Sequence, residues 1–236
     1  WDITRIAKRW YSGAAQNGIL LKDMDDEGGY KQYFTSDAVY GDVPYCYFVY
    51  TNFSGLEGYW DYTSASLGRS GTANVNLYNG NLIYTHTDIS MNGNRMPVTV
   101  SHVFNSTAKD ANDSKMLYGK GWRTNYDQRV SPVTIGGTNY YKYVDEDGTE
   151  HFFKNISGEW KDESGIDLKL TLSGSVPTIT DKKSNKLVFY ATNDANKPGF
   201  LNYIEDRNGN RQTVGYDANH RINKIADGAG REVLFA

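Results

Sequence analysis

Along much of the chain, apolar and polar residues alternate with a period of two, which is the pattern of half-buried β-strands. Leu168, Leu170 and Leu172 alternate with polar residues, and Val214 and Tyr216 do the same later in the chain. Each run is short, and turn residues separate it from the next. The pattern therefore predicts a protein made of many short strands.

The turn residues predict that consecutive strands pair antiparallel. Asn79-Gly80 separates two strand-like runs, and this dipeptide favours the tight turn of a two-residue hairpin. Gly136-Gly137 and Asp147-Gly148 separate later runs in the same way. We predict an all-β protein with an antiparallel β-meander over residues 128–236, preceded by a strand-rich segment over 71–127.

The first residues carry helical periodicity instead. Ile3, Ile6, Ala7 and Trp10 fall at i, i+3, i+4 and i+7, so Asp2–Ser12 is predicted to be a short amphipathic helix. One helix cannot close a β-sandwich with the few strands that follow it. The strand-like runs that follow the helix are Ile19–Leu21, Tyr33–Ser36 and Tyr45–Thr51.

One pattern occurs twice near the end of the chain. Ile204–Asn210 returns 21 residues later as Ile225–Arg231. A fixed period of about 20 residues is typical of repeat proteins, in which each unit buries its apolar face against a neighbour. Fainter copies lie at Asp145–Gly148 and Ile179–Asn185, the second with serine where glycine is expected. We expect the array to continue past Ala236.

Within each copy, the acidic residue and the glycine have separate roles in a turn. Asp206 and Asp227 are expected to hydrogen-bond the backbone two residues on, while Gly209 and Gly230 supply a positive φ. The residues assigned to this structural motif are Asp206, Gly209, Asn210, Tyr216, Asp217, Arg221, Asp227, Gly230 and Arg231.

This ordered set, Asp-Arg-Asn-Gly-Asn, then Tyr-Asp, Arg-Ile and Asp-x-x-Gly-Arg, resembles the Rhs/YD-repeat family of bacterial proteins. Upstream, Gly80–Leu82, Phe104–Ser106 and Tyr118–Trp122 resemble the segment that opens an Rhs shell. The resemblance implies the start of a coiled β-sheet that encloses a cavity, often around a C-terminal toxin or effector. It also implies that the partners of this chain are further repeats and an effector of the same polypeptide.

The N-terminal residues Trp1–Asn52 resemble the C-terminal end of a DNRLRE domain, a β-sandwich of bacterial surface proteins. The resemblance rests on Asp2–Thr4, Trp10, Asn17–Ile19 and Phe34–Ser36, and it implies a location outside the cell. The predicted division is a partial DNRLRE-like sandwich over 1–52, a linker over 53–70, the opening segment over 71–127 and a YD-repeat-type sheet over 128–236, with clear repeats over 199–236.

Composition narrows the class of function. A net charge of −3 gives no basic surface for nucleic acid, and no run of about 18 apolar residues is present to span a membrane. The single cysteine, Cys46, excludes a disulfide within the chain and a zinc site built from several cysteines. No phosphate-binding glycine loop occurs, so no cofactor is predicted.

The remaining candidates for chemistry are histidines and acidic runs. His86, His102, His151 and His220 are the only histidines, and none shows a spacing typical of a metal site or a catalytic group. His86 and His102 lie on predicted strands, where packing beside apolar or aromatic neighbours is favoured over the alternative of a catalytic or ligand role. The oxygen ligands of Asp23–Glu27 suit calcium, but the run lacks the spacing of a calcium loop, so a solvated turn is favoured over a calcium site. The acidic turn residues of the repeats are expected to serve the backbone.

These observations predict a scaffold segment of a secreted or cell-surface Rhs/YD-repeat protein, without enzymatic activity. The alternative is a carbohydrate- or cell-wall-binding adhesion module, since exposed aromatic residues stack on sugars. Trp60 and Trp160 are the candidates for that role, although aromatic residues on strands more often pack within the sheet.

Overall fold

The computed structural model describes residues 3–11, 14–15, 55–58, 60–93, 95–108, 118–162 and 167–235. The chain divides into two compact units, Trp1–Cys46 and Tyr47–Ala236. In the first, helix α1 runs from Thr4 to Tyr11, which confirms the predicted helix. The strands predicted between Ile19 and Thr51, like the acidic run at Asp23, lie outside the described residues. None of the described helices is long and apolar enough to cross a membrane.

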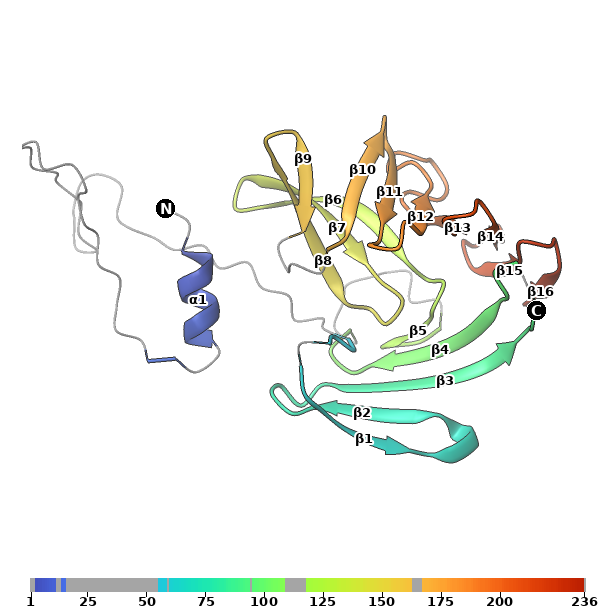
Figure 1. Cartoon of the computed structure of the whole chain (residues 1–236), viewed down its shortest axis with the longest axis horizontal. Coiled ribbons are helices and arrows are strands. Elements are labelled where there is room, and N and C mark those ends of the chain that lie inside the picture. Colours follow the sequence, from blue (N-terminus) through green and yellow to red (C-terminus); the bar gives the residue numbers. More distant parts are fainter. Residues whose placement is uncertain are drawn as a thin grey trace, which may run out of the picture. The chain divides into compact units, whose positions relative to one another are not determined.

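The second unit opens with a five-stranded antiparallel sheet whose strands follow one another in sequence order. The 3-10 turn η1 (Gly68–Ser70) joins its first two strands, and the predicted turn at Asn79-Gly80 joins the next two. The strands are β1 (Tyr62–Ser66), β2 (Thr72–Asn76), β3 (Leu82–Ser90), β4 (Thr99–Asn105) and β5 (Trp122–Thr124) (Figure 1).

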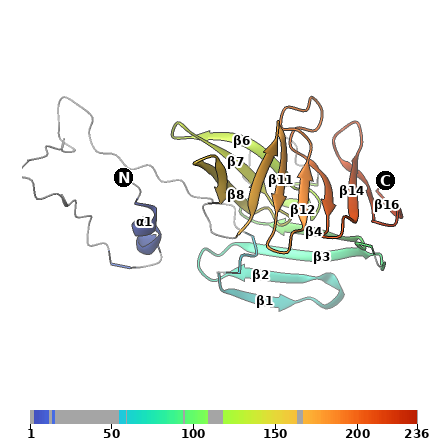
Figure 2. The same cartoon turned by 45° about the horizontal axis from the view of Figure 1, so that its top comes forward.

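An 11-stranded antiparallel sheet follows, and again each strand pairs with its neighbours in sequence. The predicted all-β meander is therefore confirmed. In both views the five-stranded sheet lies along one side of this long sheet, with β1 farthest from it (Figure 1, Figure 2). The strands are β6 (Arg129–Ile135), β7 (Thr138–Val144), β8 (Glu150–Ile156), β9 (Glu159–Asp162), β10 (Lys169–Ser173), β11 (Val176–Thr180), β12 (Lys186–Phe189), β13 (Leu201–Glu205), β14 (Arg211–Tyr216), β15 (Ile222–Ala226) and β16 (Glu232–Leu234).

The two sheets share one hydrophobic core. Val98 and Val100 contribute to it from the start of β4, and the long sheet contributes alternate residues of its strands. In β14, for example, Gln212 and Val214 are buried while Arg211 and Thr213 are exposed, which is the period-two pattern visible in the sequence. The buried core residues of the long sheet include Val130, Tyr143, Phe153, Leu170, Ile179, Phe189, Leu201, Val214, Ile222, Ile225 and Val233.

The long sheet curls so that its first strand reaches the start of β13. Arg129 and Phe200 form an isolated antiparallel bridge, and the N–H of Val130 donates to the carbonyl of Gly199 at 2.9 Å. Gly199 has a φ of +67°, and a Cβ at this position would lie 1.8 Å from the carbonyl oxygen of Val130. Only glycine fits this close approach of two backbones without a shift of the chain.

Residues 53–70, which we predicted to be a linker, contain β1 and η1. β1 pairs with β2 along its whole length, from Tyr62 opposite Asn76 to Ser66 opposite Thr72. The sequence hid this strand because four of its five residues are exposed, so it has no apolar alternation. Its stability comes from the ladder with β2 rather than from a buried face.

Candidate functional site

The aspartates of the repeat motif all begin turns of one geometry, which we call the Asp turns. They occur at Asp145, Asp181, Asp206, Asp217 and Asp227. In each, one carboxylate oxygen accepts the N–H groups of the residues two and four positions on, over 2.8–3.1 Å. The backbone N–H of the aspartate donates to the carbonyl four residues on, and its own carbonyl accepts from the residue three on.

The fourth residue of every Asp turn has a positive φ. These residues are Gly148, Ser184, Gly209, His220 and Gly230, with φ between 65° and 91°. Ser184 and His220 show that the turn forms without glycine. The sequence period of 21 residues therefore contains an additional Asp turn at Asp217, between the two visible copies.

Side chains at the fifth position complete several Asp turns. Asn210 Nδ2 donates to the second carboxylate oxygen of Asp206 at 2.8 Å, and Arg231 does the same to Asp227 through Nε at 2.7 Å. The Asn210 side chain lowers the pKa of Asp206, against the smaller opposing effect of burial. The structure thus places the predicted motif residues Asn210, Arg221 and Arg231 beside the carboxylates of their own turns.

The predicted sugar-stacking residues lie in different places. Trp60 is half-buried and stacks on Tyr78 with ring centroids 5.0 Å apart. Trp160, on β9, meets the edge of Tyr141 at 4.8 Å and packs partly against the core. The structure does not bring the two tryptophans together into one site.

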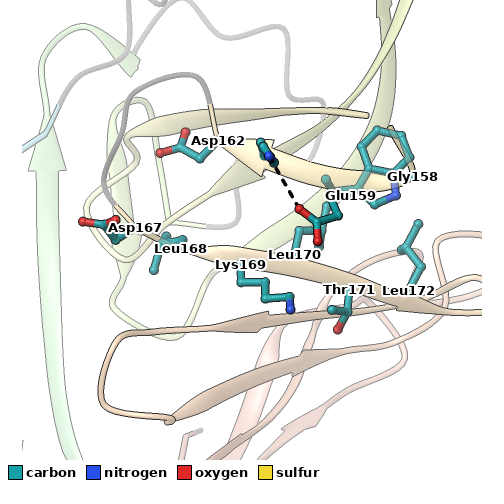
Figure 3. Close-up of a pocket in the computed structure, with 11 residues that line it drawn as sticks. Gly158, Glu159, Asp162, Asp167, Leu168, Lys169, Leu170, Thr171 and Leu172 are labelled. Carbon is teal, nitrogen blue, oxygen red and sulfur yellow. Dashed lines mark ion pairs between the residues drawn. The ribbon is translucent and has the colours of Figure 1, made fainter. Parts of the chain in front are cut away.

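Trp160 also lines a pocket of about 630 Å³ formed by Gly158–Asp162 and Asp167–Leu172. Figure 3 shows the carboxylates of Asp162 and Asp167 at one end of this pocket and Leu172 at the other. Lys161 and Glu159 form an exposed ion pair at 3.6 Å. The pocket thus combines an aromatic ring with carboxylates and lysines.

His151 belongs to a buried ionic cluster at the turn between β7 and β8. Its Nε2 lies 2.9 Å from Asp145 and 3.7 Å from Glu57, and its side chain is 4% exposed. Burial raises the pKa of Asp145 to about 7, against the hydrogen bond from His151. Burial would lower the pKa of His151, but Asp145 and Glu57 together raise it. The environment of the cluster thus favours the protonated form of both groups.

Asn81 and Asn105, from two motifs of the predicted opening segment, also meet in the structure. Asn81 Nδ2 donates to Asn105 Oδ1 at 3.2 Å, and both residues are almost fully buried. Asn105 Nδ2 in turn donates to the carbonyl of Asp147 at 3.1 Å. These buried amides are satisfied by one another and by the β7–β8 turn, so they join the two sheets at a fixed position.

Two further histidines, which we predicted to have packing roles, come together on the exposed face of the five-stranded sheet. His86 on β3 lies directly opposite His102 on β4, and the side chain of Asp88 is within 2.8 Å of Nδ1 of both rings. Sequence spacing did not reveal this cluster, because its partners are on two strands whose register is set by the hairpin. His220 is elsewhere, with its ring edge against Phe200.

Comparison with known proteins relates the chain to a family and to much longer proteins. The family described as a domain of unknown function, DUF6531, matches residues 72–153. The chain is 28% identical to the tRNA nuclease WapA of Bacillus subtilis (strain 168) over 171 residues, or 72% of this chain and 7% of that protein. The tRNA3(Ser)-specific nuclease WapA of Bacillus spizizenii is similar to the same extent. The chain therefore corresponds to a small part of the relatives that it matches.

These matches correct one sequence-based prediction. We expected a protein without enzymatic activity, but the relatives are named as tRNA nucleases. The prediction was wrong because it rested on the absence of catalytic motifs from a sequence that matches only 6–7% of each relative. The matches support a relationship to WapA-type proteins, while the finer assignments to YD repeats and to DNRLRE remain predictions.

Proposed function

We propose that this chain is a scaffold segment of a secreted or cell-surface nuclease toxin, in which its curled β-sheet supports and partly encloses the remainder of the polypeptide. The observation that carries the proposal is the meander from β6 to β16, in which each strand pairs along its length with its neighbours in sequence and the later hairpins repeat the Asp turn. Such a sheet is built from local units, each stabilised by the next, as in repeat proteins.

The proposed activity of the longer protein is cleavage of tRNA, as the names of its relatives state for them. The Rhs/YD-repeat resemblance adds the expectation of an enclosing sheet. In that arrangement the strands β6 to β16 form part of the enclosing sheet. Cleavage of tRNA is proposed for the longer protein and is not assigned to residues of these strands.

Two measurements on the full-length protein test the two parts of this proposal. Incubation with purified tRNA should give cleavage products, and intact tRNA would overturn the nuclease assignment.

Limited proteolysis tests separately whether the sheet encloses the remainder of the polypeptide. Gly199→Ala disturbs the contact between β6 and β13, so it should expose downstream segments to protease. Gly209→Ala lies in an exposed turn and should not. Equal protection in both variants would overturn the enclosing role alone.

A carbohydrate-binding role is the second candidate, favoured by the pocket that Trp160 lines beside Asp162 and Asp167. Sugars bind where an aromatic face adjoins planar polar groups. Calorimetric titration with soluble peptidoglycan fragments should show binding, which Trp160→Ala should abolish and Trp122→Ala should preserve. Binding that survives Trp160→Ala would rule out this pocket.

A further inference from the structure

A β-bulge creates the cluster on the exposed face of the five-stranded sheet. The register of β3 and β4 shifts between Thr87 and Ile89, so Asp88 is the extra residue of the bulge. A bulge turns a side chain away from its regular direction. Here one oxygen of the Asp88 carboxylate bridges the two rings, 2.8 Å from Nδ1 of His86 and 2.8 Å from Nδ1 of His102.

The hydrogen bond on the far side of His86 fixes the state of its ring. Nε2 lies 3.0 Å from the carbonyl oxygen of Arg69, which can only accept, so Nε2 carries the hydrogen. In a neutral ring, Nδ1 is then an acceptor that faces another acceptor, the Asp88 carboxylate. Two acceptors at 2.8 Å repel each other unless a cation lies between them. A proton or a metal ion can fill that role.

We propose that Nδ1 of His86, Nδ1 of His102 and the carboxylate of Asp88 bind one transition-metal ion of the zinc class. Two imidazoles and a carboxylate are a donor set that zinc favours, with water in the remaining position. The three donor atoms lie within 4.8 Å of one another. Bonds of about 2.0–2.2 Å to such an ion require only small movements of the side chains.

The surroundings of the cluster support a metal site. The carbonyl of Arg69 holds His86 as outer-shell partners of metal-binding histidines commonly do. The side chains are 26–38% exposed, so an ion and its water can reach them. Trp122 packs beside His102 with ring centroids 5.3 Å apart, and Tyr84 lies 6.1 Å from the same ring. These rings limit the motion of His102.

The metal would fix the bulge in β3 and, through Arg69, the turn that joins β1 to β2. β1 is the edge of its sheet and is largely exposed. A metal-bound cluster would therefore stabilise an edge of the fold that buries little surface. This role adds to the scaffold function and does not depend on it, since it concerns the stability of the described unit itself.

Calorimetric titration of the chelator-treated chain with Zn²⁺ tests the proposal. We expect one ion per chain, and at least about tenfold weaker binding in His86→Gln, His102→Gln and Asp88→Asn. These side chains lie on an exposed face, so the fold should persist, which circular dichroism can verify. His220→Asn is the matched control and should bind as the wild type does.

Co²⁺ provides a second readout that a merely structural role would not give. Visible absorption bands of bound Co²⁺ and quenching of Trp122 fluorescence should both appear in the wild type, and the quenching should be lost in Trp122→Phe while the bands persist. If the wild type takes up neither ion, or binds them no better than the His86→Gln/His102→Gln double variant, the proposal is overturned.

Discussion

Ser184 and Gly209 occupy the same position of two Asp turns, with φ values of 65° and 81°. The left-handed region is free of strain for glycine but costs other residues about 1–2 kcal/mol. We expect Ser184→Gly to raise the free energy of unfolding by up to about 1 kcal/mol, because the greater freedom of glycine in the unfolded chain offsets part of the gain. Gly209→Ala should lower it by about 1 kcal/mol.

Urea unfolding monitored by circular dichroism measures both effects. Ser173→Gly is the control, since Ser173 is an exposed residue at the end of β10 without a positive φ. Glycine there should be slightly destabilising. If Ser184→Gly and Ser173→Gly shift the stability in the same direction, the strain assigned to the Asp turn is absent.

The sequence allowed the turns to be predicted but not all of their members. Asp206 and Gly209 are recognisable because their types match what the turn requires locally. The turn at His220 escaped notice because histidine adopts a positive φ far less often than glycine does. Residue types and their spacing along the chain thus predicted the meander, the helix and those Asp turns that contain a recognisable Asp and Gly.

Contacts between distant segments were beyond the reach of the sequence. The bridge from Arg129 to Phe200 depends on how strongly the long sheet curls, which accumulates over many strands. The cluster of His86, Asp88 and His102 depends on the register of one hairpin and on a bulge within it. The curl of the sheet and the position of the bulge leave no periodic pattern in the sequence, so neither contact could be predicted from it.

Gly199→Ala should be more damaging than Gly209→Ala, although both glycines have a positive φ. A Cβ at residue 199 would meet the carbonyl oxygen of Val130, whereas nothing lies within 4 Å of one at residue 209. We expect Gly199→Ala to lower the free energy of unfolding by at least about 2 kcal/mol, since the backbone contact between β6 and β13 must shift. Equal losses in the two variants, measured by urea unfolding, would show that this contact adds nothing.

Leu201 and Leu234 form a matched pair for testing the core. Leu201 is 0% exposed and Leu234 is 71% exposed, and both lie on strands of the long sheet. Leu201→Ala should lower the free energy of unfolding by about 2–5 kcal/mol, through lost burial and the cavity left behind. Leu234→Ala should change it by no more than about 0.5 kcal/mol. Thermal and urea unfolding of the two variants would separate these expectations.

The buried cluster of Asp145, His151 and Glu57 should make stability fall as the pH rises. The pKa of Asp145 rises from 3.8 to about 7 on folding, and the pKa of His151 is also raised. A group whose pKa is raised on folding stabilises the protein below its unfolded pKa, and this contribution is lost as the pH passes the folded pKa. The loss should therefore extend from about pH 4 to above pH 7, by at most about 1.4 kcal/mol per pH unit for each proton.

Asp145→Asn tests this dependence because asparagine resembles the protonated acid. The stability of the variant relative to the wild type should rise between pH 4 and pH 8, measured by urea unfolding at each pH.

Asp206→Asn is the control with the opposite sign. The pKa of Asp206 is lowered by Asn210, so its contribution is present above about pH 4 and lost in acid. That variant should therefore lose stability relative to the wild type as the pH rises from 3 to 5. If the stabilities of Asp145→Asn and the wild type change in parallel with pH, then Asp145 does not take up a proton on folding, even though it is buried and lies 2.9 Å from Nε2 of His151.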